Sequence, residues 1–578
     1  MAGKVLDVTS LVRPDTLASE IGTRWTEWTT FRQKWIEEKK ELRNFVFATD
    51  TRTTSNNKLP WSNSTTTPKL TQIYDNLKAN YYAALFPNSK WMRWEAADKQ
   101  SDTLLKTQII QAYMDNKVRQ SKFELEADRL LDDYILFGNC FATVEHVTEY
   151  LTLPDGSEVP RYVGPKLVRI SPYDIVFNPV ASSFESSPKI VRALITLGEL
   201  AKMAEEGDPV YQEIFNKVMD NRRQVGLYDR FEKSDGFIAD GFNSIQLYYG
   251  SGYVETLTFY GDIYDTETNQ IKTNRKIIIV DRAYVMYDEP IANWLGETPI
   301  YHAGWRSRPD NLYAMGPLDN LVGLQYRIDH LENLKADVFD QIALPVLKIR
   351  GDVEDFQYGP GARVYMGEEG DVAPMVPDAT ALNADFQINN LQEKMEELAG
   401  APRQAMGIHT PGEKTAFEIQ TLQNAASRIF QHKAAKFEKE FIEPVLNAML
   451  EAGRRNMDES DLIRILDESS GANVFKSITR EDITARGKIV PVGARHYAER
   501  ATRVQNINQL VALKMGDPSI GAHLSGKKLA AILAYELGES DIYGENIAIQ
   551  EQAEVQGAAE DIEADHMEEM QIKAEAGF

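Results

Sequence analysis

The sequence predicts an α+β fold that is mainly helical. Apolar residues recur at every third or fourth position over two long stretches, residues 316–345 and 415–450, and this is the period of an amphipathic helix. Apolar and polar residues alternate, as in strands, over residues 141–170 and 244–304. Because 43% of the 578 residues are apolar, the chain can bury a sizeable core and more than one structural region.

The first 200 residues begin with helices and end with strands. Helical spacing covers most of residues 17–136, and a polar stretch at 49–67 predicts a loop. One helical face predicts a core or a subunit contact. It carries four aromatic residues: Trp25, Trp28, Phe31 and Trp35. The turn Pro154-Asp-Gly predicts a β-hairpin over residues 141–170, and short helices at 197–206 and 210–223 follow.

A long helix is predicted between Pro317 and Pro345. Proline suits the first turn of a helix, and a later proline stops it. The side opposite the apolar stripe is net acidic and carries five residues: Asp319, Asp329, Glu332, Asp337 and Asp340. This face predicts either a solvated surface or an acidic lining of whatever the helix borders.

A second long helix follows a loop rich in glycine and proline. The helix begins at Thr415 and runs about 35 residues, which is about 50 Å at 1.5 Å per residue. A helix of that length serves several layers of structure and indicates a large assembly. Pro444 lacks an N–H group, and its ring crowds the carbonyl four residues earlier, so we expect a bend between Gln431 and Glu440.

The C-terminal part combines strands, helices and an acidic end. We expect residues 462–466 and 488–492 to form a strand pair, and helices to follow up to residue 549. Residues 551–575 contain nine acidic residues and a single basic one, Lys573. This composition predicts a solvated or disordered tail.

Composition and charge exclude several classes of protein. Lysine and arginine number 63 against 87 aspartate and glutamate, a formal charge of −24, which disfavours a free-standing nucleic-acid binder but not the passage of DNA. No run of about 18 uncharged apolar residues is present, so we expect neither a membrane span nor a secretory signal. We expect the protein to stay in a cytosol-like compartment. The single cysteine, Cys140, lies in an apolar run and indicates buried packing rather than a disulfide.

The residues that carry chemistry do not assemble into a recognisable active site. No two of the 8 histidines have the spacing of a zinc site, and no nucleophile elbow is present. Residues 521–528 follow a phosphate-binding loop except at Lys528, which stands where a magnesium-binding hydroxyl is needed. We therefore expect no catalytic residue, metal or cofactor. An enzyme built on dispersed carboxylates, such as a metal-dependent hydrolase, stays open as an alternative.

The order of several short segments resembles the portal proteins of tailed bacteriophages, the head-to-tail connectors, and most of all those of short-tailed phages. The segments are Ser171-Pro-Tyr-Asp-Ile-Val-Phe-Asn-Pro, Pro299-Ile-Tyr-His-Ala-Gly-Trp-Arg, Tyr313-Ala-Met-Gly-Pro-Leu, Leu324-Gln-Tyr-Arg-Ile-Asp, Leu344-Pro-Val-Leu, Gly359-Pro-Gly-Ala and Thr415-Ala-Phe-Glu-Ile. The similarity covers roughly residues 20–500. No single segment is specific, and the resemblance rests on their order and intervals.

The resemblance implies a portal-type fold with wing, stem, clip and crown regions. Laid on this chain, it gives an N-terminal wing (1–200), a wing-to-stem region with the first stem helix (201–244), a clip (245–310), the second stem helix (311–345), wing strands and a helix (346–400), a tunnel loop (401–414), a long kinked wing helix (415–454), a crown (455–550) and the acidic tail (551–578). It places nine residues in the loop that faces the DNA: Met406, Gly407, Ile408, His409, Thr410, Pro411, Gly412, Glu413 and Lys414. It also implies that the acidic face of the helix predicted between Pro317 and Pro345 is a candidate lining of the DNA channel.

The resemblance further implies a non-enzymatic structural protein of the virion. Twelve copies would form a ring at one capsid vertex, beside the major capsid protein. The ring would dock the large subunit of the terminase motor, pass double-stranded DNA without sequence specificity during packaging and ejection, and then hold tail adaptor and tail proteins. The protein would be found in the host cytoplasm during assembly and then in the virion. Another virion structural protein, such as a head-tail adaptor, is the nearest alternative.

Overall fold

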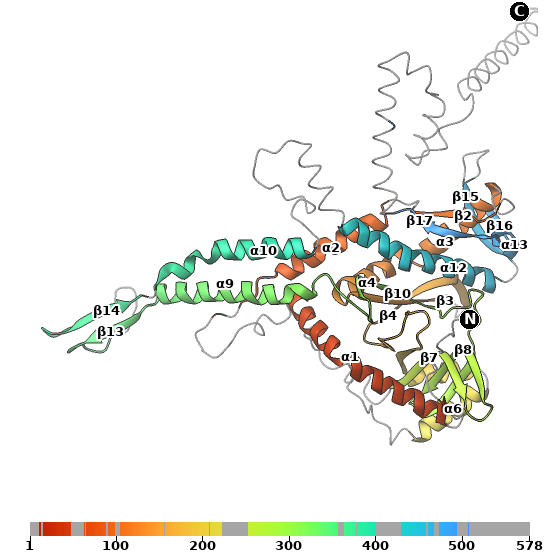
Figure 1. The fold of residues 1–578 in the computed structure, drawn as a ribbon, viewed down its shortest axis with the longest axis horizontal. Helices are drawn as coiled ribbons and strands as arrows, with labels where there is room; N and C mark the ends of the chain where they lie inside the picture. The colour runs from red at the N-terminus through yellow and green to blue at the C-terminus, as the bar shows by residue number, and fades with distance from the viewer. Residues whose placement is uncertain are drawn as a thin grey trace, which may run out of the picture. The chain divides into compact units, whose positions relative to one another are not determined.

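The computed structural model describes residues 11–12, 16–47, 63, 65–87, 91–98, 104–154, 157–206, 209–221, 253–356, 363–376, 378–399, 429–457, 460–466, 473–493 and 507. The chain divides into two compact units, residues 1–493 and 494–578. All described residues except Ile507 belong to the first unit, which combines helices with several sheets (Figure 1). The mixed α and β character predicted from the sequence is confirmed.

Four helices form most of the N-terminal part: α1 (Leu17–Phe47), α2 (Lys69–Leu85), α3 (Leu104–Gln120) and α4 (Phe123–Leu136). The aromatic stripe predicted on α1 is only partly buried. Trp25 is fully enclosed, and Trp28 packs against the same core, but Phe31 is 75% exposed. Six residues at 100° each place Phe31 about 120° around the helix from Trp25, outside the buried face.

A three-stranded sheet packs against helix α4. The predicted hairpin is confirmed as β3 (Asn139–Thr152) and β4 (Glu158–Ile170), and β10 (Ile300–Gly304) pairs with the other edge of β3. Cys140 is fully buried in β3, as predicted. The turn from α4 into β3 needs Gly138, whose φ is +72° and where a Cβ atom would lie 2.4 Å from the backbone nitrogen of Gly316.

The largest sheet joins strands that the sequence analysis had assigned to different regions. Its order is β5 (Ile175–Phe177), β6 (Lys189–Thr196), β7 (Tyr253–Asp265), β8 (Gln270–Val280) and β9 (Tyr284–Pro290), with β1 (Leu11–Val12) parallel to β7. Helix α1 packs on it through Trp25, while α5 (Leu197–Glu206) and α6 (Pro209–Asn221) cover residues near Val254 and Val280. Strand β7 pairs with β6 over Tyr253–Tyr260, so the strands predicted as a module at 245–310 share one sheet with β5 and β6.

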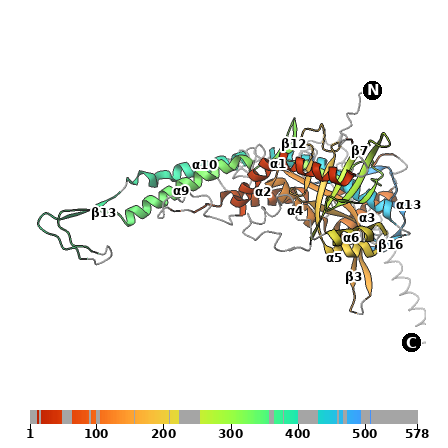
Figure 2. The same cartoon turned by 90° about the horizontal axis from the view of Figure 1, so that it is seen from below.

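A helical arm with a strand hairpin occupies residues 319–399. It consists of the short helix η2 (Asp319–Leu321), α9 (Val322–Ala343), β13 (Val346–Arg350), β14 (Asp371–Met375), η3 (Ala379–Ala384) and α10 (Asp385–Ala399). Helices α9 and α10 contact each other, and the antiparallel β13–β14 pair lies beyond their ends in both views (Figures 1 and 2). Helix α9 ends at Ala343, just before Pro345 as predicted, since Leu344 precedes a proline and such a residue is disfavoured in the α region. We call residues 319–399 the arm.

The helix around Pro444 contains a π-helical turn. Residues 429–437 are α-helical, the turn labelled η4 (Glu438–Ile442) is π-helical, and α12 (Glu443–Asn456) continues after it. The N–H of Glu443 donates to the carbonyl of Glu438, five residues back, just before Pro444 interrupts the ladder. Such turns accompany bends in helices. The bend between Gln431 and Glu440 stays a prediction.

The strands after residue 456 pair differently from the prediction. Strand β15 (Asp461–Leu466) pairs with β16 (Asn473–Ile478), whereas β17 (Gly487–Pro491) pairs with β2 (Met92–Ala96), nearly 400 residues away along the chain. The short helix α13 (Arg480–Ile483) separates the two pairs. In the part of the chain that the structure describes, no helix is long and apolar enough to cross a membrane.

Candidate functional site

The arm exposes an unusual amount of apolar surface. Its exposed large apolar side chains are Tyr326, Leu334, Phe339, Leu344, Val346, Ile349, Tyr365, Met366, Met375, Val376, Phe386 and Leu398. Phe339 is 62% exposed, and Phe386 is 78% exposed. Single exposed apolar residues are ordinary on a protein surface, but many on one projecting element indicate contact with another molecule.

Two ion pairs with buried members hold the root of the arm. Lys39 of α1 is buried and pairs with Asp319, whose second oxygen accepts the N–H of Gly316 at 2.8 Å. Where the arm ends, near the C-terminus of α10, Lys69 of α2 forms an ion pair with Glu396, and both residues are buried. Breaking one partner of a buried pair leaves an uncompensated charge. The two helices of the arm are therefore fixed to α1 and α2 where they begin and end.

The five acidic residues predicted as one face of α9 do not share an open surface. Asp319 lies in the root ion pair, and Asp329 is 1% exposed. Asp337 and Asp340 accept hydrogen bonds from Asn63, and Glu332 lies 3.8 Å from the ammonium group of Lys335. A polar segment before α2 covers part of the predicted acidic face, whereas Asp340 is exposed. The lining of a channel by these residues stays a prediction.

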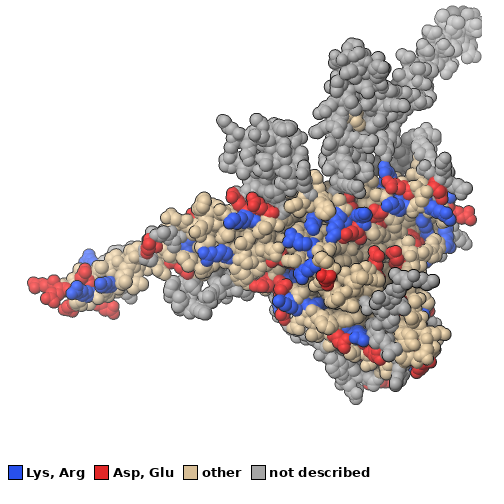
Figure 3. Space-filling model, in the orientation of Figure 1, with Lys and Arg blue, Asp and Glu red and all other residues tan. Residues whose placement is uncertain are grey.

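Exposed acidic residues gather instead on the strand hairpin. Around β13 and β14 they are Asp352, Glu354, Asp355, Glu368, Glu369 and Asp371, and red atoms are conspicuous at this end of the arm in Figure 3. Lys348, Arg350 and Arg363 offset them in part. This acidic cluster was not predicted, since it lies in a segment expected to belong to the wing.

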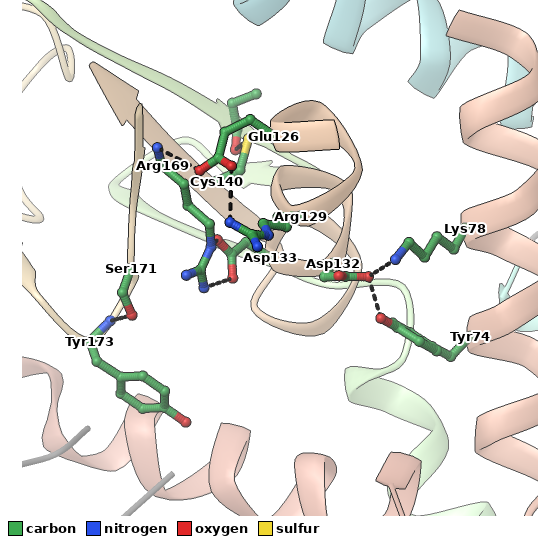
Figure 4. A network of polar contacts seen from close by, with 11 residues as sticks. Tyr74, Lys78, Glu126, Arg129, Asp132, Asp133, Cys140, Arg169, Ser171 and Tyr173 are labelled. Atoms are coloured by element: carbon green, nitrogen blue, oxygen red, sulfur yellow. Dashed lines mark hydrogen bonds and ion pairs between the residues drawn. The ribbon is translucent and has the colours of Figure 1, made fainter. Parts of the chain in front are cut away.

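A polar network joins α4 to both of its neighbours (Figure 4). Asp132 accepts a hydrogen bond from the Tyr74 hydroxyl and pairs with Lys78 of α2 at 2.8 Å. The next residue, Asp133, is buried and accepts two hydrogen bonds from the Arg169 guanidinium of β4, at 2.5 and 2.7 Å. Adjacent carboxylates on one helix thus bind a helix on one side and a sheet on the other.

The segment Pro299–Arg306, which carries part of the resemblance, forms β10 and the turn after it. His302 is packed against Phe141, Phe177 and Phe184, and its Nε2 donates to Asn139 Oδ1 at 3.0 Å. Because Asn139 Oδ1 also accepts the N–H of Ala314, this oxygen acts as an acceptor and a proton of the imidazole lies on Nε2. Burial among the rings lowers the pKa of His302 to about 3.

The buried His302 predicts a dependence of stability on pH. The unfolded chain binds a proton on this residue below pH about 6.5, whereas the folded chain stays neutral down to pH about 3, so the free energy of unfolding falls as the pH is lowered between these values. Between pH 6.5 and 4.5 the loss from this residue is about 2–3 kcal/mol. Urea unfolding of the native chain and of His302→Gln at several pH values in this range measures the free energy of unfolding of each. As the pH is lowered, the native chain should lose that amount of stability relative to the variant. A constant difference would contradict the assignment.

The candidate DNA-facing loop lies outside the described residues. This holds for Met406 to Lys414, for residues 222–244 of the predicted wing-to-stem region and, except for Ile507, for the part of the predicted crown beyond residue 493. Within the described ranges, no group of three or more His, Cys, Asp or Glu side chains could hold a metal ion.

Comparison with known proteins adds no relative. No protein-family model matches the chain, and no curated protein sequence is similar to it.

Proposed function

We propose that the chain is the subunit of a portal ring, through which double-stranded DNA enters and leaves a phage capsid. The arm is the observation that supports this most directly. A portal needs two long helices that flank a strand module, and α9, β13–β14 and α10 supply such a unit within residues 322–399. A head-tail adaptor has no need of both helices and the module between them.

The structure of the arm also changes which residues we propose for the stem, the clip and the wing. Helices α9 and α10 fit the stem pair, and the β13–β14 hairpin fits the clip that meets the motor and tail proteins. The strands at 253–290 then belong to the wing, because they share one sheet with β5 and β6. Helices α1 to α4 and the β3–β4–β10 sheet complete that wing.

Charge and exposed surface support the same proposal. Twelve copies would carry 12 × −24 = −288 formal charges, and an acidic ring repels phosphates, so DNA would slide rather than bind. The apolar side chains of the arm would be covered by neighbouring subunits. Partners of the ring would be the major capsid protein, the terminase large subunit and the tail proteins, with no catalytic step in the chain itself.

Replacing Phe339 with aspartate is expected to abolish ring assembly. The side chain is mostly exposed in the single chain, so the variant should fold, but a charge buried between subunits without a partner is costly. Phe339→Leu, which keeps an apolar side chain, should still assemble. Size-exclusion chromatography with light scattering distinguishes the variants, and rings of unchanged size from Phe339→Asp would remove the arm from the subunit interface.

Deleting residues 407–413 tests the proposed contact with DNA. We expect rings to form normally and packaging or retention of DNA to fall, since the deletion removes the loop that would touch the passing duplex. A packaging assay with purified proheads and motor measures this. Loss of folding would show that the segment is a core connection instead.

A further inference from the structure

A short polar segment before α2 lies along α9 in matched register. Thr67 N–H donates to Asp329 at 3.0 Å, and Thr65 N–H and Oγ1 donate to Asn333 Oδ1 at 2.8 and 3.0 Å. Asn333 Nδ2 in turn donates a hydrogen bond to the carbonyl oxygen of Thr65 at 3.0 Å. The N–H of Asn63 donates to Asp337 at 2.5 Å. We call residues 63 and 65–67 the strap.

The partners of the strap on α9 follow a fixed spacing and form a polar stripe. Its members are Gln325, Asp329, Asn333, Asp337 and Asp340. Most are four residues apart, a rise of about 6 Å along a helix. Every second residue of an extended chain advances about 6.6 Å. The two repeats match, and the strap runs antiparallel to the helix.

The contacts between strap and stripe are hydrogen bonds to the backbone and to short polar groups. Asn63, Thr65, Thr66 and Thr67 offer no large apolar side chain, so little hydrophobic burial holds the strap. A hydrogen bond within a protein replaces one to water, and its net contribution is small. A segment held in this way opens locally long before the core unfolds.

Opening the strap would change the charge that α9 presents. Asp329 is hidden under the strap, and its hydrogen bonds come from neutral donors, Thr67 and Gln325. Asp337 and Asp340 likewise accept from the neutral Asn63. Release would therefore expose Asp329 and free Asp337 and the already exposed Asp340 from their neutral donor, so that three carboxylates lie open within about three turns of one helix.

We propose that the polar stripe of α9 is a register-specific docking site for an extended segment, and that the strap of the same chain occupies it reversibly. The strap then acts as a latch between the segment leading into α2 and the arm. This inference does not depend on the chain forming a ring, and it concerns residues to which the proposed function gives no role.

Hydrogen–deuterium exchange of the full chain tests the docking site. Asn333→Leu keeps the size of the side chain and removes both its donor and its acceptor. Exchange of the amides in the peptide containing residues 63–69 should rise at least about tenfold, while exchange in α4 and α12 stays unchanged. His330→Leu makes a similar change on an exposed position of the same helix and should leave the strap as it is. Unchanged exchange of the strap in Asn333→Leu, or faster exchange throughout the chain, would overturn the proposal.

A disulfide tests whether the latch opens. In Thr65→Cys/Asn333→Cys, one sulfur replaces Thr65 Oγ1 and the other stands one bond from the Asn333 oxygen that Oγ1 contacts, and the native Cys140 is buried. Oxidation should slow exchange of the strap at least about tenfold relative to the reduced variant. No slowing would show that the strap is permanently closed, and a disulfide between two chains on a non-reducing gel would show that it docks on a neighbour instead. Either result would contradict a reversible latch within one chain.

Discussion

Replacing Asp133 with alanine is expected to lower the free energy of unfolding by about 3–5 kcal/mol. The carboxylate is 2% exposed and binds the Arg169 guanidinium through two hydrogen bonds. Without Asp133, that guanidinium, whose side chain is 32% exposed, would lose the carboxylate that it binds through two hydrogen bonds. Chemical denaturation followed by tryptophan fluorescence measures the loss.

Two controls separate the lost ion pair from a general effect of mutating α4. Arg129→Ala removes a mostly exposed partner of Glu126 on the same helix, and exposed pairs contribute about 0–1 kcal/mol. Asp133→Leu/Arg169→Met replaces the buried pair with apolar side chains and should recover much of the stability. If Asp133→Ala is as stable as Arg129→Ala, the network in Figure 4 does not hold α4 to β4.

Replacing Trp25 with alanine is expected to cost about 3–5 kcal/mol. Trp25 is fully buried between α1 and the largest sheet, against Val176, Leu257 and Ile277. Its ring also lies 4.8 Å from the buried Arg192 guanidinium, so truncation leaves a cavity and removes a cation–π contact.

Phe31→Ala is the matched control, six residues along the same helix. Because Phe31 is mostly exposed, its loss should change the stability of the single chain by about 0.5 kcal/mol or less. Thermal unfolding of the two variants should differ by several degrees. Equal losses would mean that both aromatic residues share one buried face, as the sequence pattern alone suggests.

These two helix positions show what the sequence could and could not predict. Three- and four-residue spacing identified α1 and its aromatic residues, but the spacing of a few residues does not define the buried arc closely enough to exclude Phe31. Local patterns predicted the β3–β4 hairpin and the end of α9 before Pro345, because a turn and a proline act on neighbouring residues.

Pairing between distant segments was the part that local patterns could not supply. Strand β17 pairs with β2 and β7 pairs with β6, and alternation along one strand does not reveal its partner. For the same reason the acidic face of α9 was expected to be open. Its cover is the strap, a segment that no periodicity links to that helix.

The arm itself was divided between two predicted regions. The sequence analysis assigned α9 to the stem and residues 346–400 to the wing, whereas β13, β14 and α10 continue from α9 as one unit. The strands are only five residues long, too short to stand out against the strand-rich block at 253–290. Our proposal that β13 and β14 form the clip rests on this arrangement.

The central claim is that this chain assembles into a ring with an open channel. Mass photometry of the purified full-length protein, with electron microscopy of the same sample, tests it most directly. The account predicts particles of about twelve subunits, about 785 kDa from 12 × 65.4 kDa, with a central hole in end-on views, and a neighbouring subunit number would support it equally. A stable monomer or dimer with no ring at any concentration would contradict it.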